Sequence, residues 1–290
     1  MQNYLTIDVE DYFQVAAFAD IISPKDWDAM EQRVQINIAP LLRLLKKYEV
    51  LATFFVVGWI AEHNPDIVRA ILDDGHDIGC HSYWHRNIYE LTPEAFRKDT
   101  LKAKTILENI CNRKITAYRA PSYSITKKSL WALDILKEMG FTTDSSIFPI
   151  RHDIYGIPDA PRFRYKLPQQ GMEEFPISTA IFFGQKIPVA GGGYFRLLPY
   201  WFTKLALKKI NNREKQPFVF YLHPWEIDNA QPRFKQARLL SKFRHYNNLN
   251  KTMDRLERLL NDFDFIPLPN GGTEDKTILP KTELLKKSGQ

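Results

Sequence analysis

The chain has few cysteines, and it lacks any long apolar run and any strong excess of one charge. Its 290 residues include only Cys80 and Cys111, too few for the disulfide framework of a small secreted domain. A chain of this length buries enough apolar surface to fold without disulfides or structural metals. We therefore expect two reduced thiols, and we expect any bound metal ion to be catalytic rather than structural.

The sequence also shows no segment of the kind that directs a protein to a membrane. Residues 1–5 lead directly into a strand-like run, without the basic region and apolar core of a signal peptide. No stretch approaches the ~18 apolar residues of a membrane-spanning helix. These features predict a cytoplasmic protein without a transmembrane segment, with association at the inner membrane face as an alternative.

The charge balance is mildly basic and argues against one class of partner. The 40 Lys and Arg residues exceed the 34 Asp and Glu residues by only +6, and part of this excess lies at Lys276, Lys281, Lys286 and Lys287. No basic block alternates with aromatic residues, as it would on a nucleic-acid surface. We therefore expect no nucleic-acid partner, and composition leaves the oligomeric state open.

Short β-prone runs alternate with helical patterns along most of the chain. Strands are expected at residues 4–7, 51–57, 76–81, 117–119, 141–144, 218–222 and 263–267, and helices at 38–48, 66–73, 93–110, 127–139, 201–210 and 249–260. This alternation with short connections is typical of parallel βα units.

Residues 148–200 depart from this alternation. Prolines, aromatics and glycines are frequent there, and residues 191–193 are three consecutive glycines. The glycines either bring backbone amides close to a bound ligand or form an ordinary turn. We interpret the segment as an irregular insertion in a single domain over residues 1–270, followed by a solvated tail over 271–290.

Unusual polar residues follow the expected strands. They are Asp8, Glu10, Asp11, His81, His85, Arg119, Asp144 and His223. The carboxyl ends of parallel strands converge on one face, where active sites are built. We therefore expect these side chains to form one site.

Two of these clusters predict a metal ion. His81 and His85 are four residues apart, so a helical turn would direct both imidazoles at one ion. The crowded carboxylates of Asp8, Glu10 and Asp11 repel each other, which favours a bound cation. In an extended strand Asp8 and Glu10 point to one side and Asp11 to the other.

Five motifs in this order resemble the polysaccharide deacetylase superfamily, carbohydrate esterase family 4. They are residues 6–11 (TIDVED), 81–85 (HSYWH), 119–121 (RAP), 144–146 (DSS) and 222–223 (LH). Residues 8–15, 191–196 and 223–226 further resemble a subgroup encoded with bacterial exopolysaccharide and exosortase loci. The resemblance implies an α/β fold, a distorted (β/α) barrel of about seven or eight parallel strands with loop insertions.

The resemblance also implies an activity. It is that of a metal-dependent hydrolase, with zinc as the expected ion, which removes N-acetyl groups from an amino-sugar polysaccharide or its precursor during exopolysaccharide biosynthesis. Asp8 would act as the general base, held by Arg119. His223 would act as the general acid, oriented by Asp144.

The metal ligands implied by the resemblance are His81, His85 and one acidic residue. The family has two adjacent aspartates in its first motif, whereas this chain separates Asp8 from the next acid by one residue. Same-face geometry favours Glu10 as the third ligand, with Asp11 as the alternative. The expected substrate-binding residues are Leu222, which would meet the acetyl methyl group, and Pro121, Tyr123, Tyr194 and Trp225.

Two other functions are consistent with the same residues. The first is a small-molecule C–N hydrolase on this fold, which a closed pocket with short loops would favour. The second is a carbohydrate-binding protein without catalysis, on a decayed enzyme scaffold. The presence of Asp8, both histidines, Arg119 and His223 argues against the second, because decay usually removes at least one such residue.

Overall fold

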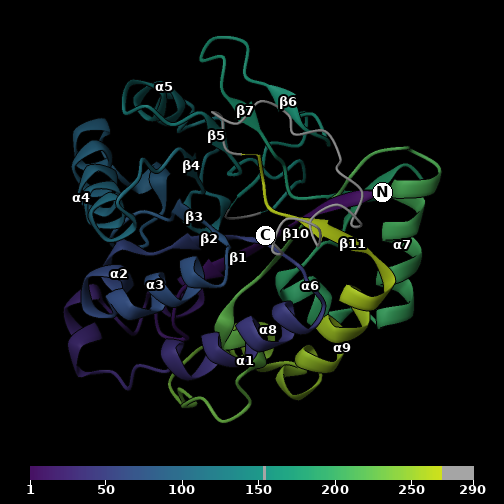
Figure 1. The fold of residues 1–290 in the computed structure, drawn as a ribbon, viewed down its shortest axis with the longest axis horizontal. Coiled ribbons are helices and arrows are strands. Elements are labelled where there is room, and N and C mark those ends of the chain that lie inside the picture. Colours follow the sequence, from purple (N-terminus) through teal and green to yellow (C-terminus); the bar gives the residue numbers. More distant parts are fainter. Residues whose placement is uncertain (153–154, 270–290) are drawn as a thin grey trace, which may run out of the picture.

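The computed structural model describes residues 1–152 and 155–269, which form a sheet surrounded by helices (Figure 1). In order across the sheet, the strands are β10 (Val219–Leu222), β1 (Gln2–Val9), β2 (Thr53–Val56), β3 (Asp77–Cys80), β4 (Ala117–Tyr118), β5 (Thr143–Asp144), β7 (Glu173–Glu174) and β6 (Tyr165–Lys166). Neighbours from β10 to β7 run parallel, and β6 is antiparallel to β7. This open barrel confirms the expected fold class, a distorted (β/α) barrel.

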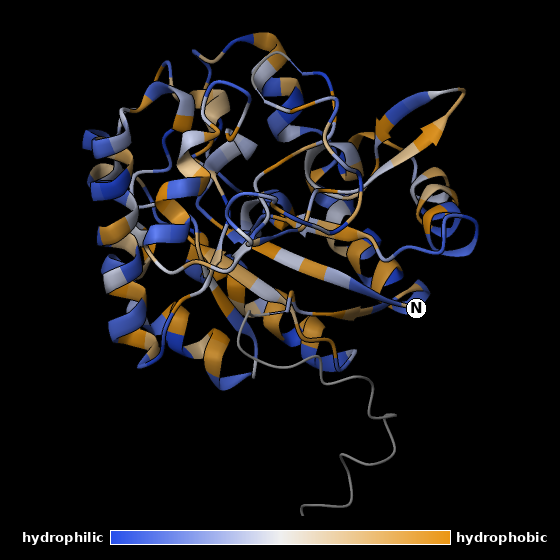
Figure 2. Cartoon of the chain, turned by 90° about the horizontal axis from the view of Figure 1, so that it is seen from above, coloured by the Kyte–Doolittle hydropathy of each residue, from blue (hydrophilic) through white to orange (hydrophobic). Residues whose placement is uncertain are grey.

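Helices cover the outer face of the sheet. They are α1 (Val34–Lys47), α2 (Gly58–His63), α3 (Pro65–Asp73), α4 (Pro93–Cys111), α5 (Trp131–Glu138), α6 (Gly192–Leu197), α7 (Tyr200–Asn212), α8 (Leu239–Tyr246) and α9 (Leu249–Asp262). Apolar residues concentrate on the strands and on parts of the helices that face them (Figure 2). None of the helices in the described ranges is long and apolar enough to cross a membrane.

The central strand shows why the sheet is so apolar. Every residue of β1 after Gln2 is buried, because other strands flank it and side chains cover both of its faces. The buried Thr6 hydroxyl donates to the Phe220 carbonyl in β10, which satisfies its polar atom. The last expected strand is confirmed as β11 (Asp264–Ile266), which pairs with the start of β1.

Helix starts follow local capping chemistry. As expected, α4 begins at Pro93, and the Thr92 hydroxyl accepts a hydrogen bond from the Ala95 N–H. In contrast, α1 begins four residues before its apolar pattern, because the Asp11 carboxylate accepts from the N–H groups of Arg33 and Val34. A cap supplied by a distant residue cannot be recognised from the local sequence.

The segment over residues 148–200 is more regular than expected. It contributes β6 and β7 to the main sheet, a hairpin of β8 (Thr179–Phe182) and β9 (Gln185–Pro188), and α6. Two-residue strands such as β6 and β7 are too short to give a periodic pattern.

The two thiols, Cys80 in β3 and Cys111 at the end of α4, are free.

The first two of the three consecutive glycines are needed for close packing, whereas a Cβ atom at Gly193 would meet nothing closer than 3.9 Å. Gly191 has a φ of +127° and forms a bridge with Tyr221 in β10, where a Cβ atom would lie 2.0 Å from the Tyr221 carbonyl oxygen. Gly192 also has a positive φ, and its Cβ would lie 2.3 Å from the Tyr221 hydroxyl. The run therefore lets the chain approach β10 more closely than any side chain permits.

This packing predicts a difference between two glycine substitutions. Gly184→Ala is the matched control, because Gly184 also has a positive φ but a Cβ atom added to it would meet nothing within 4 Å. We expect Gly184→Ala to lower the free energy of unfolding by about 1 kcal/mol, and Gly191→Ala by about 1–3 kcal/mol more. Urea unfolding measures both, and equal losses would contradict the packing argument.

Candidate metal centre and active site

A cavity of about 170 Å³ lies beyond the carboxyl ends of the parallel strands. Its lining includes Asp8, Glu10, His81, His85, Tyr123, Tyr155, Tyr221, His223 and Trp225. These residues come from β1 and from the loops after β3, β4 and β10, among other segments. The convergence of strand ends therefore brings together residues that lie up to about 200 positions apart in the sequence.

Glu10, His81 and His85 form the one possible metal-binding group found among the described residues. Their potential ligand atoms all lie within 4.8 Å of one another. His81 Nδ1 lies 2.8 Å from the Arg119 carbonyl oxygen, which can only accept, so Nδ1 carries the proton. This leaves His81 Nε2 as the ligand atom, an arrangement typical of metal-binding histidines.

The chemistry of these three residues fits a divalent ion. Glu10 Oε2 lies 2.6 Å from His85 Nε2, so these two candidate ligand atoms point at the same space. The buried His85 Nδ1 has no hydrogen-bond partner in the described ranges. Burial lowers the pKa of His81 to about 4, which favours the neutral ring that a ligand requires. One carboxylate with two imidazoles leaves coordination positions open for water and substrate.

The histidine pair does not lie on a helical turn, so that part of the prediction is wrong. Ser82 and His85 both have left-handed backbone conformations, with φ values of 58° and 49°. The buried Asp99 of α4 accepts hydrogen bonds from the N–H groups of Tyr83 and Trp84, which holds the turn in place. Sequence reasoning missed Asp99, whose only signal is a carboxylate on the buried side of an amphipathic helix.

Asp11 lies outside the metal-binding group. Its carboxylate accepts hydrogen bonds from the N–H groups of Tyr12, Arg33 and Val34. Both oxygens are therefore bound to backbone N–H groups, Oδ1 to that of Tyr12 and Oδ2 to those at the start of α1. Of the two acidic residues considered as the third ligand, the geometry brings Glu10 to the histidines.

A buried ion pair holds Asp8. Arg119 is fully buried, and its Nη1 donates to Asp8 Oδ1 at 2.6 Å and to the Thr6 hydroxyl at 2.8 Å. Its Nε and Nη2 donate to the backbone and side-chain oxygens of Ser145. Asp8 Oδ2 faces the cavity, 3.5 Å from the Tyr123 hydroxyl.

His223 lies opposite Asp8 in the cavity. Its Nε2 lies 3.9 Å from Asp8 Oδ2 and 3.4 Å from Glu10 Oε1. The Trp225 ring stacks on the imidazole, and Trp225 Nε1 donates to Glu10 Oε1. Burial disfavours a charged ring, but Glu10 and Glu226 outweigh this and raise the pKa of His223 to about 9.

The partner of His223 is Glu226, so the prediction that Asp144 orients this ring is wrong. His223 Nδ1 lies 3.0 Å from Glu226 Oε2. Asp144 instead accepts from the Ser146 hydroxyl and lies at the paired position to Glu174 in the neighbouring strand. The three-residue spacing of His223 and Glu226 in one short turn is a sequence signal that could have identified this contact.

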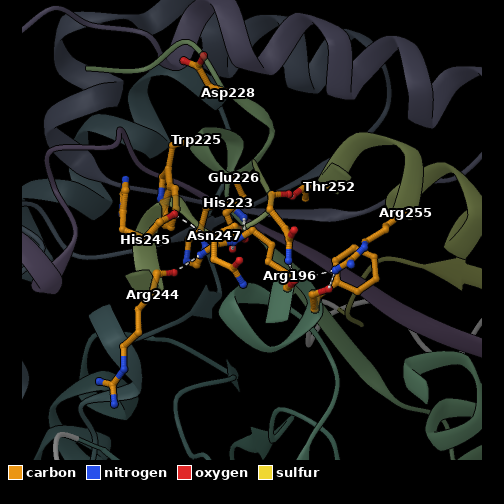
Figure 3. A network of polar contacts seen from close by, with 12 residues as sticks. Arg196, His223, Trp225, Glu226, Asp228, Arg244, His245, Asn247, Thr252 and Arg255 are labelled. Atoms are coloured by element: carbon orange, nitrogen blue, oxygen red, sulfur yellow. Dashed lines mark hydrogen bonds and ion pairs between the residues drawn. The ribbon is translucent and has the colours of Figure 1, made fainter. Parts of the chain in front are cut away.

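Arg196 in turn holds Glu226 (Figure 3). Arg196 Nε donates to Glu226 Oε1 at 2.7 Å, and both side chains are buried. The remaining N–H groups of Arg196 donate to the carbonyl oxygens of Arg244, His245 and Asn247. These bonds join α6, α8 and the following loop to the histidine of the cavity.

The expected substrate-binding residues are only partly in the cavity lining. Tyr123 and Trp225 line it, whereas Tyr194 lines a second, adjoining cavity. Leu222 and Pro121 are buried and are not among the lining residues. Successive side chains of a strand point to opposite faces, so Tyr221 faces the cavity and the adjacent Leu222 packs away from it.

Comparison with known families agrees with this geometry. Residues 27–143 match the polysaccharide deacetylase family, and residues 145–270 match a domain of unknown function, DUF3473. Residues 27–143 therefore form a polysaccharide deacetylase domain. His81, His85 and Arg119 lie in the deacetylase match, whereas His223 and Glu226 lie in the other, so both matched segments build the cavity.

Curated relatives in this family match a limited part of the chain. A peptidoglycan-N-acetylglucosamine deacetylase of Bacillus cereus is 35% identical over 95 residues, which are 32% of this chain and 34% of that protein. A chitooligosaccharide deacetylase of Azorhizobium caulinodans is 37% identical over 79 residues, or 27% and 38% of the two chains. The matches thus span about a third of the length of these relatives.

Solved structures support the fold. The crystal structure of a proposed polysaccharide deacetylase from Mycobacterium smegmatis aligns with a TM-score of 0.58 at 17% identity. The alignment covers 91% of this chain and 86% of that one. The likeness therefore extends through both matched segments and shows a common architecture.

Substitution of the two neighbouring acids tests the third ligand. We expect Glu10→Gln to weaken the binding of added zinc at least about tenfold, because it removes the negative charge of the candidate ligand. Asp11→Asn should keep the metal and lower the free energy of unfolding by about 1 kcal/mol, because it weakens the helix cap. Zinc content during titration with a chelator and thermal unfolding distinguish the two, and the reverse pattern would make Asp11 the ligand.

The paired acids away from the cavity predict a pH dependence. Burial, followed by the adjacent Asp144, raises the pKa of Glu174 well above its ordinary value. Glu174 therefore keeps its proton in the folded protein above about pH 4.3, where the unfolded chain releases it. The free energy of unfolding therefore falls as the pH rises above about 4.3. Glu174→Gln, which is neutral, should become more stable relative to the wild type between pH 5 and 8. The free energy of unfolding is measured by urea unfolding at each pH, and a constant difference between the two proteins from pH 5 to 8 would contradict this prediction.

Proposed function

We propose that this chain is a zinc-dependent hydrolase that removes N-acetyl groups from an amino-sugar polysaccharide or its precursor. The observation that carries this proposal is the opposition of Asp8 Oδ2 and His223 Nε2, 3.9 Å apart beside the group of Glu10, His81 and His85. Amide hydrolysis needs a base for the attacking water and an acid for the leaving nitrogen, and this geometry supports one of each.

The metal-binding group and Asp8 would together activate the attacking water. A divalent ion held by Glu10, His81 and His85 would polarise the acetyl carbonyl and lower the pKa of the attacking water. Asp8 accepts the proton of that water at Oδ2, since Oδ1 is held by Arg119. Arg119 thus acts as a positioning residue that keeps the carboxylate aimed at the cavity.

His223 supplies the second proton transfer. Its Nε2 faces the cavity and donates a proton to the nitrogen of the amino sugar as the C–N bond breaks. Its Nδ1 is occupied by Glu226, which fixes the ring orientation. Glu226 therefore takes the role that the family resemblance assigns to Asp144.

The surroundings of the cavity favour an extended substrate over a small amide. Tyr123 and Tyr221 contribute aromatic surface to the cavity lining, against which a sugar ring can pack. A second cavity of about 470 Å³ shares four lining residues with the first, which leaves room for further sugar units. We place the reaction in bacterial exopolysaccharide biosynthesis, as the subgroup resemblance of residues 8–15, 191–196 and 223–226 suggests.

Acetate release tests this proposal. We expect zinc-reconstituted protein to release acetate from N-acetylglucosamine oligomers and to stop when a chelator removes the metal. Asp8→Asn should lower kcat by at least about a hundredfold, because the base is lost while the shape is retained. His81→Ala should abolish both zinc binding and acetate release.

His63→Ala serves as the matched histidine control, since His63 lies in α2 and does not line the cavity. It should retain zinc and wild-type kinetics. Zinc bound through His81 without acetate release from any oligomer would favour a different amide substrate. Absence of both would support a sugar-binding protein instead.

A further inference from the structure

A second cavity, of about 470 Å³, adjoins the metal centre. The two cavities share the lining residues Ala16, Ala17, Tyr155 and Tyr221. The remaining lining of the second comes largely from α6, α8 and the loop after α8. A substrate with its acetamido group at the metal centre therefore has a direct path into this second space.

The wall shared by the two cavities is aromatic. Tyr155 and Tyr221 border both spaces, and Tyr194 of α6 continues the wall in the second. The His152 ring also lines the second cavity and stacks on Tyr155, with the two ring centroids 3.9 Å apart. Aromatic faces of this kind suit the apolar faces of sugar rings.

The lining of the second cavity also carries positively charged side chains. Arg238 and Arg244 line it, and Asp20 is the acidic residue in the lining. Arg238 Nη2 lies 2.9 Å from Asp20 Oδ2, but both side chains are largely exposed to solvent, so this ion pair is weak. In the part of the chain that the structure describes, no carboxylate forms an ion pair with Arg244.

Arg244 is held by its backbone and not by its side chain. Its carbonyl oxygen accepts a hydrogen bond from Arg196 Nη2 at 2.9 Å, within the buried network that also orients Glu226. The side chain extends away from this network (Figure 3). The structure thus presents a guanidinium at the cavity from an anchored position.

We propose that the second cavity binds an anionic group of the substrate, carried by the part of the substrate that adjoins the N-acetyl group that is removed. This inference rests on the proposed function. Arg244 is the main recognition residue, and Arg238 contributes a second positive charge. A guanidinium binds carboxylate and phosphate through paired N–H donors, so the anion is either the carboxylate of a uronic acid unit or the phosphate of a glycosyl carrier.

Matched substrates test the proposal. The first arm compares a tetrasaccharide of alternating N-acetylglucosamine and glucuronate with its neutral methyl ester. The second compares UDP-N-acetylglucosamine with the methyl glycoside of N-acetylglucosamine. We expect kcat/KM to be higher for the anionic member of at least one pair, and the arm that shows the preference identifies the source of the anion.

Substitutions test whether Arg244 of α8 causes the preference for anionic substrates. Arg244→Gln should reduce the ratio of kcat/KM between the anionic and neutral substrates about fivefold, which is typical of a partly exposed ion pair. Arg244→Lys should retain part of the preference, because it keeps the charge but loses the paired donors. Arg43→Gln, which removes an exposed arginine of α1 outside the cavity, should keep the wild-type ratio.

Binding of the same oligosaccharides to Asp8→Asn protein separates this inference from the proposed function. Calorimetric affinity that favours the anionic form and depends on Arg244 supports the anionic subsite, even if no acetate is released. Equal kcat/KM and equal affinity for charged and neutral forms, or a preference that Arg244→Gln leaves intact, would overturn it, whether or not acetate is released.

Discussion

The site depends on one buried cation, the guanidinium of Arg119. A charge without solvent is costly unless it is paired and fully hydrogen-bonded. Arg119 meets this requirement by binding Asp8 and Thr6 in β1 and Ser145 after β5. Its own carbonyl accepts from His81, so the same residue holds the candidate base and one candidate metal ligand. Loss of this pairing would therefore affect both halves of the proposed chemistry.

A second buried arginine performs the equivalent function on the other side of the cavity. Arg196 binds Glu226, which holds His223, and it also binds three carbonyl oxygens at the end of α8 and in the loop beyond it. Arg196 and Glu226 lie in the segment that matches a domain of unknown function, whereas the histidine pair lies in the deacetylase match. The geometry thus gives that second segment a specific task, the orientation of His223 and the construction of the adjoining cavity.

The parts of the fold that could be predicted from the sequence are those controlled by local chemistry. The alternation of strands and helices follows from apolar periodicity, and the start of α4 follows from Thr92 and Pro93. The start of α1 could not be predicted in this way, because its cap is Asp11, more than twenty residues earlier. The short strands β6 and β7 gave no signal either, since two residues carry no period.

The amino-acid order alone specifies which residue types are available for chemistry and the strand ends at which they lie. Asp8, His81, His85, Arg119 and His223 could be named on that basis, because parallel strands bring their carboxyl ends to one face. The contacts among these side chains follow from the three-dimensional fold. Glu10 rather than Asp11 reaches the histidines, and Glu226 rather than Asp144 meets His223. Such choices depend on strand register and on turns with left-handed residues, which place side-chain atoms within hydrogen-bonding distance across about 200 residues of sequence and leave no local pattern.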